Sequence, residues 1–545
     1  MISIVGPWAD AACASARTAS SRTETPGIRR FIVLIASHLP CVRRASHACR
    51  EPGSLPPAPA RPPARPRPTS PSCPNRPPRP STPRRRAHPS PRRAPGSEST
   101  QRAARTLRAL RPDLAHAARL HGDGRDRYDD GRPGRRRGAA VAIAGTWVWS
   151  SGSFVQGLIQ GMDPLVSQAH GRGDDAGASL ALHRGLVITL VVSLPLMALW
   201  ASTEPILLAL GQDPVVAGLA QTYLLARLPS AVGFLLFAAL RQYLAARGVT
   251  RPAMWVMFAG NGVNVLLNWM LIFGHLGMAP LGVVGAGIAT SITNTLLPLG
   301  LWLWMRAYHL PDGAWRRFDP RMLELAGFGR YLWLGFPVGV QLALEANAFT
   351  IAMLMVGWLG VASLAAHQVV INMASFTFML PLGIAIGASA RAGNLIGAGD
   401  AARLRMACRT ALYMGGGVMS IAAIVFVTLR SWLPALYVDD AAVVTIAATL
   451  LPIAAGFQIA DGVQVVGGGL MRGMGRPYAG AVVNLIGFYG LGLPLAHHLA
   501  FRSGLGIVGV WWGMAVALAG VAIMLCLWVA RTARRPLEEL CVDTR

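Results

Sequence analysis

The sequence contains no lysine, so all 51 basic residues are arginine, and charged residues make up only 14% of its 545 positions. The lack of lysine has no evident physical reason, whereas a very GC-rich coding sequence would account for it. So few charges, combined with 53% apolar residues that come in long runs, exclude an ordinary soluble protein of this size. The composition indicates a protein that crosses a membrane several times.

Cysteine is also scarce. The seven cysteines show neither the spacing of a disulfide framework nor that of a zinc site. Cys408, Cys526 and Cys541 lie in or beside apolar runs, where a free thiol acts as a small hydrophobic side chain. The sequence also shows no nucleophile–base set and no phosphate-binding loop. We therefore expect no disulfide, no cofactor and no enzymatic activity.

Residues 1–138 differ from the rest of the chain. They contain 28 Arg and 9 Asp or Glu, which is a surplus of 19 out of the net charge of +26. Arginine, proline, alanine and serine dominate this leader, and no amphipathic period is present, so we expect it to be disordered. Its one apolar run, 31–39, is too short to cross a bilayer. Aromatic residues are nearly absent, which argues against an RNA-binding arm and a nucleic-acid partner.

After Gly138 the chain contains apolar stretches long enough to span a bilayer as helices. They are 139–162, 182–201, 216–240, 253–274, 284–306, 331–358, 361–388, 407–429, 442–467, 479–499 and 506–530. Arginines gather on alternate connections and after residue 530. The positive-inside bias places these connections and the C-terminus in the cytoplasm. We expect an all-α, eleven-span protein of the inner or plasma membrane that is monomeric.

Three short motifs recur at nearly one spacing. QAHGRGDDA at position 168 matches NLIGAGDAA at 394, RGVTRP at 247 matches RGMGRP at 472, and LGVVG at 281 matches LGIVG at 505. The order predicts a tandem duplication of a six-span unit, with both copies in the same orientation. We expect pseudo-symmetric lobes at 139–306 and 331–531, a linker at 307–330 and a tail at 532–545.

The duplication predicts a span that the sequence does not contain. The counterpart of 331–358 falls at about 105–132, where the residues are too charged to enter a bilayer. A shifted reading frame over 127–133 allows the residues Asp-Thr-Thr-Met-Val-Gly-Arg. We hypothesise a frameshift upstream of about Gly138, so that the leader and the missing first helix share one cause. Resequencing tests this hypothesis, because an alternate frame over 105–137 that is not apolar would rule it out.

Acidic residues inside two spans are the strongest indication of a functional site. Asp461 lies between Gln458 and Gln464 at spacings of three, so all three side chains share one helix face. Glu345 lies mid-span, four residues after Gln341 and on the same face. An aspartate at the centre of a span costs about 2.5–3.5 kcal/mol on insertion scales. We expect no basic partner within either span.

Two carboxylates that face one cavity could share a Na⁺ ion through oxygen ligands or hold a proton in turn. The alternative is a neutral carboxyl group that is hydrogen-bonded between helices. The sequence does not choose between Na⁺ and H⁺.

Other polar residues also follow helical spacing. Asn264 and Asn268 form an amide stripe in 253–274, for which hydrogen bonding between helices is a strong alternative to a site. A second stripe could line a cavity or join helices, and it consists of Gln368, Asn372 and Ser375. Asp163, just before Pro164, is interpreted as a structural or gating residue.

Six motifs carry a resemblance to a known family. They are GMDPLVSQAHGRGD (161–174), LRQYLAARGVTRP (240–252), NVLLNWMLIFG (264–274), LGVVGAGIAT (281–290), LGFPVGVQLALE (334–345) and IADGVQVVGGGLMRG (459–473). Together they resemble the multidrug and toxic compound extrusion (MATE) family, in its bacterial sodium- or proton-driven branch. The resemblance covers about 139–531. It implies twelve helices in two lobes around a cleft, and the export of organic, often cationic, drugs in exchange for a cation.

The resemblance also assigns roles to residues. The family pattern places a functional acid eight residues after a proline, as Glu345 follows Pro337, and Asp461 matches the second acid of the same lobe. Asn264 and Asn268 match positions that line the cation site of the first lobe. Gln341, Gln458 and Gln464 are then expected to share the cavity of the two acids.

Two other functions are left open by the sequence. A flippase of the same superfamily, moving a lipid-linked precursor, would need arginines in its cleft to bind a pyrophosphate. The spans are nearly free of arginine, with Arg227 as the clear exception, and this argues against a flippase. A non-transporting product or scaffold is the other alternative, supported by the missing first helix. Drug susceptibility of an efflux-deficient host separates these functions.

Overall fold

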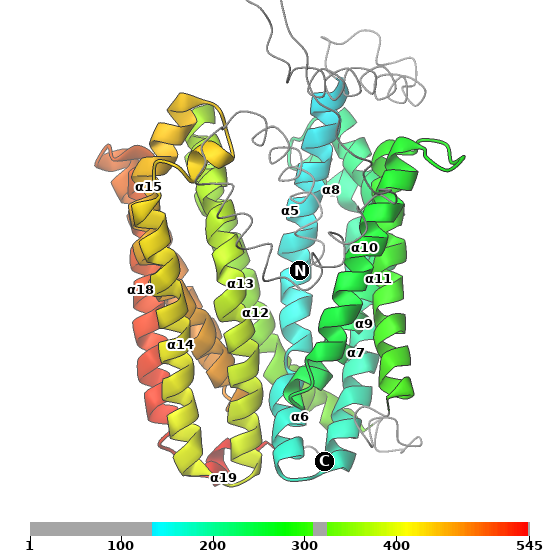
Figure 1. Cartoon of the computed structure of the whole chain (residues 1–545), viewed down its shortest axis with the longest axis vertical. Helices are drawn as coiled ribbons and strands as arrows, with labels where there is room; N and C mark the ends of the chain where they lie inside the picture. Colours follow the sequence, from blue (N-terminus) through cyan, green and yellow to red (C-terminus); the bar gives the residue numbers. More distant parts are fainter. Residues whose placement is uncertain (1–132, 309–323, 543–545) are drawn as a thin grey trace, which may run out of the picture. The chain divides into compact units, whose positions relative to one another are not determined.

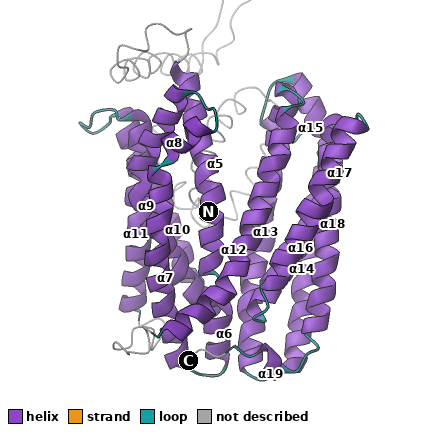
Figure 2. Cartoon of the chain, turned by 180° about the vertical axis from the view of Figure 1, so that it is seen from behind, coloured by secondary structure: helices purple, strands orange, loops and turns teal. Residues whose placement is uncertain are grey.

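The computed structural model describes residues 133–308 and 324–542, which form helices joined by short connections, with no strand among them (Figures 1 and 2). The long helices are α5 (Pro133–Ile159), α7 (Asp175–Ala201), α9 (Pro214–Ala246), α10 (Arg251–Phe273), α11 (Gly282–Ala307), α12 (Leu325–Gly357), α13 (Val361–Gly397), α14 (Ala401–Thr428), α15 (Ala441–Gly473) and α18 (Gly506–Thr532). The short ones are α6 (Met162–Gly171), α8 (Thr203–Ala209), α16 (Tyr478–Asn484), α17 (Leu493–His497) and α19 (Leu537–Leu540).

Ten helical segments of the described residues are long and apolar enough to span a membrane. The remaining predicted span, 139–162, coincides with α5, which is not among those ten. The leader up to 132, the charged segment at 105–132 and most of the predicted linker lie outside the described residues.

Several helices extend beyond the predicted spans at one end of the bundle. α7 begins at residue 175 instead of 182, and α14 begins at residue 401 instead of 407. Hydropathy does not detect these polar turns, but side-chain caps stabilise them. Asp174 accepts from the backbone N of Gly177, and Asp400 from that of Arg403, both at 2.9 Å. We call this end, which also carries α19, the arginine-rich end.

Buried apolar side chains form two cores, which confirms the predicted two-lobe fold. α7, α9, α10 and α11 pack together in the first lobe, and α13, α14, α15 and α18 pack together in the second (Figure 1). α5 packs against both α9 and α12. α12 contributes to both cores, with Tyr331 and Leu334 in the first and Ala348 and Val356 in the second. The lobes therefore share α12.

Glycines line the contacts between the lobes, which we call the seam and define as α5 against α12 and α6 against α13. A Cβ atom added at Gly171 would lie 2.2 Å from the carbonyl oxygen of Asn394, and one at Gly397 would lie 2.1 Å from that of Gln168. The duplication relates these two contacts, because 168 and 171 correspond to 394 and 397. Backbones thus meet almost directly across the seam. Such a surface can close tightly and separate without disentangling large side chains.

The C-terminal segment crosses the arginine-rich end from the second lobe to the first. Gln168 Nε2 donates to the carbonyl oxygens of Leu540 at 3.1 Å and Gly473 at 3.4 Å, and its Oε1 accepts from the backbone N of Val542 at 2.7 Å. Leu540 is buried in the core of the second lobe, whereas Val542 packs against that of the first. The segment therefore joins the two lobes.

Gln168→Ala is expected to loosen this segment. The substitution removes two hydrogen bonds to this segment and one to Gly473, each of which contributes a net 0.5–1.5 kcal/mol or so. We expect hydrogen exchange at the backbone amide of Val542 to become about tenfold faster, since roughly 1.4 kcal/mol corresponds to that factor. Gln212→Ala is the control, because Gln212 is exposed at the opposite end. Unchanged exchange in Gln168→Ala would show that other contacts hold the segment.

Candidate functional site

Glu345 is held by two amide side chains from different helices. Its Oε2 accepts from Gln464 Nε2 of α15 at 3.1 Å and from Asn484 Nδ2 of α16 at 3.3 Å. Two neutral donors orient the carboxylate without neutralising it. The group is therefore positioned in the interior of the second lobe and still carries its charge when ionised.

Asp461 lies close enough to Glu345 for their charges to interact, and its side chain is only 6% exposed. Among the described residues it has no hydrogen-bond partner. Glu345 is half-buried, and two carboxylates that repel each other inside a protein are costly unless a positive charge or a proton joins them. Carboxylate and amide oxygens also suit Na⁺. The part of the chain that the structure describes has no cluster of three or more His, Cys, Asp or Glu for a multivalent metal.

Asn484 is a site residue that the sequence analysis missed. It donates to Glu345 and also, at 3.4 Å, to the backbone carbonyl oxygen of Gln341. Directly after it, Leu485–Gly492 forms π-helical turns, which occur often at functional sites. The sequence signal that could have identified Asn484 is that it is a single amide residue in the otherwise apolar span 479–499.

Gln341 fills a space between two glycines. A Cβ atom at Gly480 would lie 2.2 Å from Gln341 Oε1, and one at Gly468 would lie 3.0 Å from Gln341 Nε2. α12 can approach α15 and α16 so closely only because both positions lack a side chain. Gln341 is therefore tightly packed between α15 and α16, and its backbone shares the donor Asn484 with Glu345.

Gly480→Ala is expected to destabilise the protein by about 1–3 kcal/mol, because the added methyl group overlaps the Gln341 amide. Gly490→Ala lies in the same span but has nothing within 4 Å of its Cβ position, so it is the matched control. Thermal unfolding in detergent measures both variants. Equal melting temperatures would contradict the packing described here.

The other predicted cavity residues are placed differently. Gln458 is fully buried and donates to Thr377 Oγ1 of α13 at 2.5 Å, so its amide nitrogen joins α13 and α15 instead of reaching Glu345. Ser375 is exposed and donates to the carbonyl oxygen of Ile371 in its own helix at 2.7 Å. Gln368 and Asn372 are half-buried, and neither makes a hydrogen bond through its side chain to a described residue.

Asn264 and Asn268 form part of an amide ladder in the first lobe. Asn268 Nδ2 donates to Asn264 Oδ1 at 2.9 Å, and Asn264 Nδ2 donates to Thr293 Oγ1 of α11 at 3.2 Å. This arrangement is the helix-to-helix bonding that was the alternative to a site. The oxygen of Asn268 is buried and has no partner among the described groups.

Asp163 lies at the seam, where groups of both lobes surround it. Its side chain is 3% exposed and accepts hydrogen bonds from Gln242 Nε2 of α9 and, at 3.1 Å, from Ser389 Oγ of α13. Arg472 Nε of α15 is 3.9 Å from Asp163 Oδ2. The residue interpreted as structural or gating thus joins the lobes. Position 389 is also the counterpart of 163 in the duplication.

Arg472 corrects one expectation. No basic partner is expected within either acidic span, but Arg472 at the end of α15 is 4% exposed and its charge interacts with that of Glu345. Sequence spacing could not show this, because Arg472 reaches back along α15 into the bundle. Partial burial and, after it, Arg247 lower the pKa of His170 in α6, so this imidazole is mainly neutral at pH 7.

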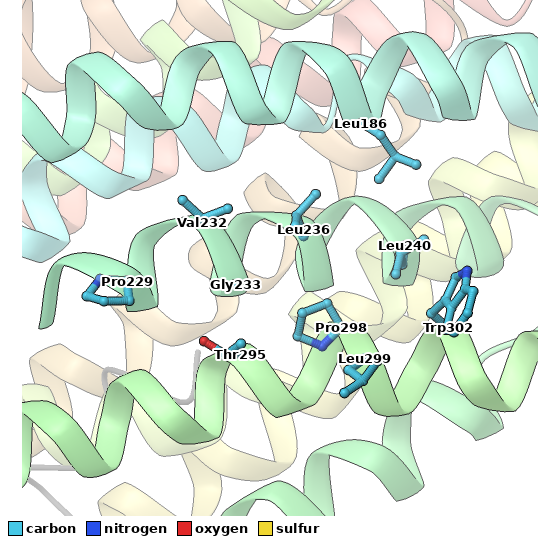
Figure 3. A pocket seen from close by; sticks show the side chains of 10 residues that line it. All are labelled: Leu186, Pro229, Val232, Gly233, Leu236, Leu240, Thr295, Pro298, Leu299 and Trp302. Carbon is cyan, nitrogen blue, oxygen red and sulfur yellow. The ribbon is translucent and has the colours of Figure 1, made fainter.

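A separate apolar pocket of about 550 Å³ lies in the first lobe between α7, α9 and α11 (Figure 3). Its lining residues are Leu186, Pro229, Val232, Gly233, Leu236, Leu240, Thr295, Pro298, Leu299 and Trp302. None of them is charged, so the pocket offers no carboxylate to a cation. It does not include the carboxyl pair, which belongs to the other lobe.

Two duplicated helical lobes, with a carboxyl pair inside the spans of the second, define a multi-pass membrane transporter, not an enzyme. The MatE family profile matches residues 132–270 and 337–497, one stretch in each lobe. The chain is 37% identical over 417 residues to "Probable multidrug resistance protein NorM" of Bradyrhizobium diazoefficiens, covering 74% of this chain and 88% of that protein. It therefore belongs to the MatE family, which confirms the resemblance found in the sequence.

Two further comparisons agree. The chain is 32% identical over 397 residues to "Multidrug and toxin extrusion protein 2" of Mus musculus, covering 72% of this chain and 68% of that protein. The crystal structure of the eukaryotic MATE transporter AtDTX14 superimposes with a TM-score of 0.68 at 24% identity, covering 78% of this chain and 93% of that one. The latter likeness concerns the fold alone.

Proposed function

We propose that this protein is an efflux antiporter that exports small organic, often cationic, compounds in exchange for Na⁺ or H⁺. The observation that carries the proposal is the pair of buried Asp461 and half-buried Glu345 inside one lobe of a MatE protein. The names of its relatives, multidrug resistance protein and multidrug and toxin extrusion protein, support the substrate class.

We infer that the arginine-rich end faces the cytoplasm, because positively charged connections are retained on that side. The C-terminal segment then lies in the cytoplasm, and the protein resides in the inner or plasma membrane. The seam and the C-terminal segment close this end in the present structure. Transport requires the lobes to separate there and to close at the opposite end.

Coupling requires the ion to bind the two facing states with different affinity, because a ligand shifts a conformational equilibrium only by that difference. Ionised Glu345 and Asp461 attract a cation or a proton, and a bound ion removes their mutual repulsion. Because an organic cation would be attracted to the same charges, the ion and the substrate compete. This competition favours exchange over co-transport.

The flippase alternative finds no support at Arg227. This buried guanidinium donates to Tyr223 Oη at 3.0 Å and lies over the same ring, so it is already engaged within α9.

Expression in an efflux-deficient bacterial host tests the proposed function. We expect tolerance of cationic dyes to rise several-fold, and to depend on an intact ion gradient. The full-length chain and a version with the first helix restored should be compared, since the latter is the form implied by the duplication. A restored chain that reaches the membrane and never raises tolerance would favour a scaffold or flippase.

A further inference from the structure

Residues 536–542 of the C-terminal segment have the shape of a short peptide ligand bound at the arginine-rich end. Leu537–Leu540 form the single turn α19, and Cys541 is extended, with φ −64° and ψ 129°. Successive side chains of an extended chain point to opposite sides. Accordingly, Leu540 is 1% exposed, Cys541 is exposed and Val542 is half-buried. The segment therefore turns two alternate apolar side chains towards the protein.

The second lobe holds the first half of this segment. Leu540 belongs to the core of that lobe, and Leu537 packs against the same core. Arg476 Nη2 donates to the backbone carbonyl oxygen of Glu539 at 2.7 Å. The ion pair between Arg535 and Glu539, at 3.5 Å, is half exposed on both sides, so it contributes little. Apolar packing and a backbone contact thus fix the segment to the lobe from which it emerges.

The first lobe recognises the backbone of the second half. Gln168 of α6 donates to the carbonyl oxygen of Leu540 at 3.1 Å and accepts from the backbone N of Val542 at 2.7 Å. Arg172, also of α6, donates to the carbonyl oxygen of Val542 at 3.3 Å. The side chain of Val542 packs against the core of the first lobe. Hydrogen bonds to the main chain and one apolar contact therefore define this half of the groove.

The two repeats differ at this groove. Gly475 forms part of it, because a Cβ atom there would lie 2.7 Å from Val542 Cγ2, and the matching position in the first repeat is Thr250. Asn394 is the counterpart of Gln168, but its buried Oδ1 has no hydrogen-bond partner among the described groups. Of these two repeat-related amides, only Gln168 therefore holds the C-terminal segment.

The contacts on the two lobes can exist together only while the arginine-rich end is closed. Separation of the lobes moves α6 away from the second lobe, to which Leu540 is anchored. A ligand that binds one state better shifts the equilibrium towards that state by the difference in affinity. Because the segment is tethered directly to α18, its effective concentration at the groove is high, and a few contacts suffice.

We propose that residues 536–542 are an intramolecular ligand of this groove between the lobes, and that their binding holds the arginine-rich end closed. The groove takes an extended peptide with apolar side chains at alternate positions. Before the end opens, the segment detaches from Gln168 and Arg172 and stays on the second lobe through Leu540. The segment thereby restrains opening. The proposal rests on the lobe movement that the proposed antiporter function requires.

Access to a cysteine at Ser167 tests the proposal, because Ser167 is fully buried at the seam. The seven native cysteines are replaced, and the purified protein is labelled with a maleimide in detergent, without ion gradient or substrate. A stop codon at Leu537 removes the segment. We expect labelling to become about tenfold faster, within the usual 5–150-fold range of coupling between sites. A stop codon at Asp543 is the matched control, because it keeps residues 536–542, and its labelling should match that of the full-length chain.

Val542→Asp tests the same contact in the full-length chain, should the shortened chain fail to fold. It keeps Leu540 and α19 in place but sets a charge against the apolar surface of the first lobe, which is costly. Labelling should become about fivefold faster or more, again within the range of coupling between sites. Glu538→Gln, at an exposed position of α19, is the control and should label like the wild type.

Unchanged labelling in both the chain that stops at Leu537 and Val542→Asp would overturn the proposal. It would also be overturned by a stop at Asp543 that accelerates labelling as much as the stop at Leu537, since the anchor would then lie beyond Val542. Dye export with unchanged labelling would leave the antiporter function standing without this restraint. Faster labelling in a chain that never exports dye would support the restraint and contradict the antiporter function.

Discussion

Replacing Glu345 by Gln, or Asp461 by Asn, is expected to abolish export while leaving the protein in the membrane. Each change removes one of the two charges that attract the coupling ion but keeps the size of the side chain. The amide donors to Glu345, from Gln464 and Asn484, would still find an oxygen acceptor in a glutamine. We expect at least a tenfold or so loss of ion-driven transport, the scale of a typical coupling energy of 1–3 kcal/mol.

Asp439→Asn is the matched control for these two variants. It makes the same chemical change at an exposed position in the loop before α15. Its transport should match that of the wild type. Unchanged transport in both Glu345→Gln and Asp461→Asn, at equal amounts of protein in the membrane, would remove the carboxyl pair as the ion site.

Gly397→Ala is expected to keep the arginine-rich end from closing. Its Cβ atom would lie 2.1 Å from the carbonyl oxygen of Gln168, which belongs to the other lobe and is backbone, so the lobes themselves must move apart. Overpacking of this kind costs about 1–3 kcal/mol. The closed population should therefore fall about 5–150-fold, and transport should fall with it.

Labelling of a cysteine at Ser167 measures this effect, because Ser167 is fully buried at the seam and becomes accessible only when the end opens. A membrane-impermeant maleimide applied from the arginine-rich side should react about tenfold faster in Gly397→Ala, within the population range given above. Gly387→Ala is the control, since it lies in the same helix with nothing within 4 Å of its Cβ position. Equal labelling in the two variants would mean that close backbone contact does not govern the seam.

The spans, the duplication and the two acids could be predicted from the sequence because each leaves a local signal. Twenty apolar residues in a row indicate a span, and an acid within them is anomalous by itself. The neighbours of Glu345 leave no such signal. Asn484 is 139 positions away in the sequence, and only the packing of α12 against α16 brings the two together.

The position of Arg472 in the sequence does give a signal, but that signal suggests a role in topology and not a contact inside the bundle. An arginine at the end of a span is expected to mark the cytoplasmic side, and that interpretation is sufficient until the structure shows where the guanidinium points. Aligning the two repeats could have indicated a different contact for Arg472, because Ala401 and Gly468 replace the acid and the tyrosine that hold Arg247. A lost local partner indicates that the remaining group has found another one.

The predicted cavity glutamines of α15 also differ in the partners that the structure gives them. Gln464 reaches Glu345, whereas Gln458, two turns earlier in α15, bonds to Thr377 of α13. Both lie on the face predicted from helical spacing, but a face is wide enough to contact two different helices. Spacing along one helix therefore predicts which side chains point inwards, and not which partner each of them meets.

Gradient-driven uptake into proteoliposomes tests the antiporter account most directly. Purified protein is reconstituted, a fluorescent organic cation is added outside, and an outward gradient of Na⁺ or H⁺ is imposed. We expect the dye to accumulate with at least one of the two gradients, not to accumulate without a gradient, and not to accumulate in Glu345→Gln under any condition. Dye movement that is the same with and without both gradients, or that persists in Glu345→Gln, would contradict cation exchange at the buried carboxyl pair.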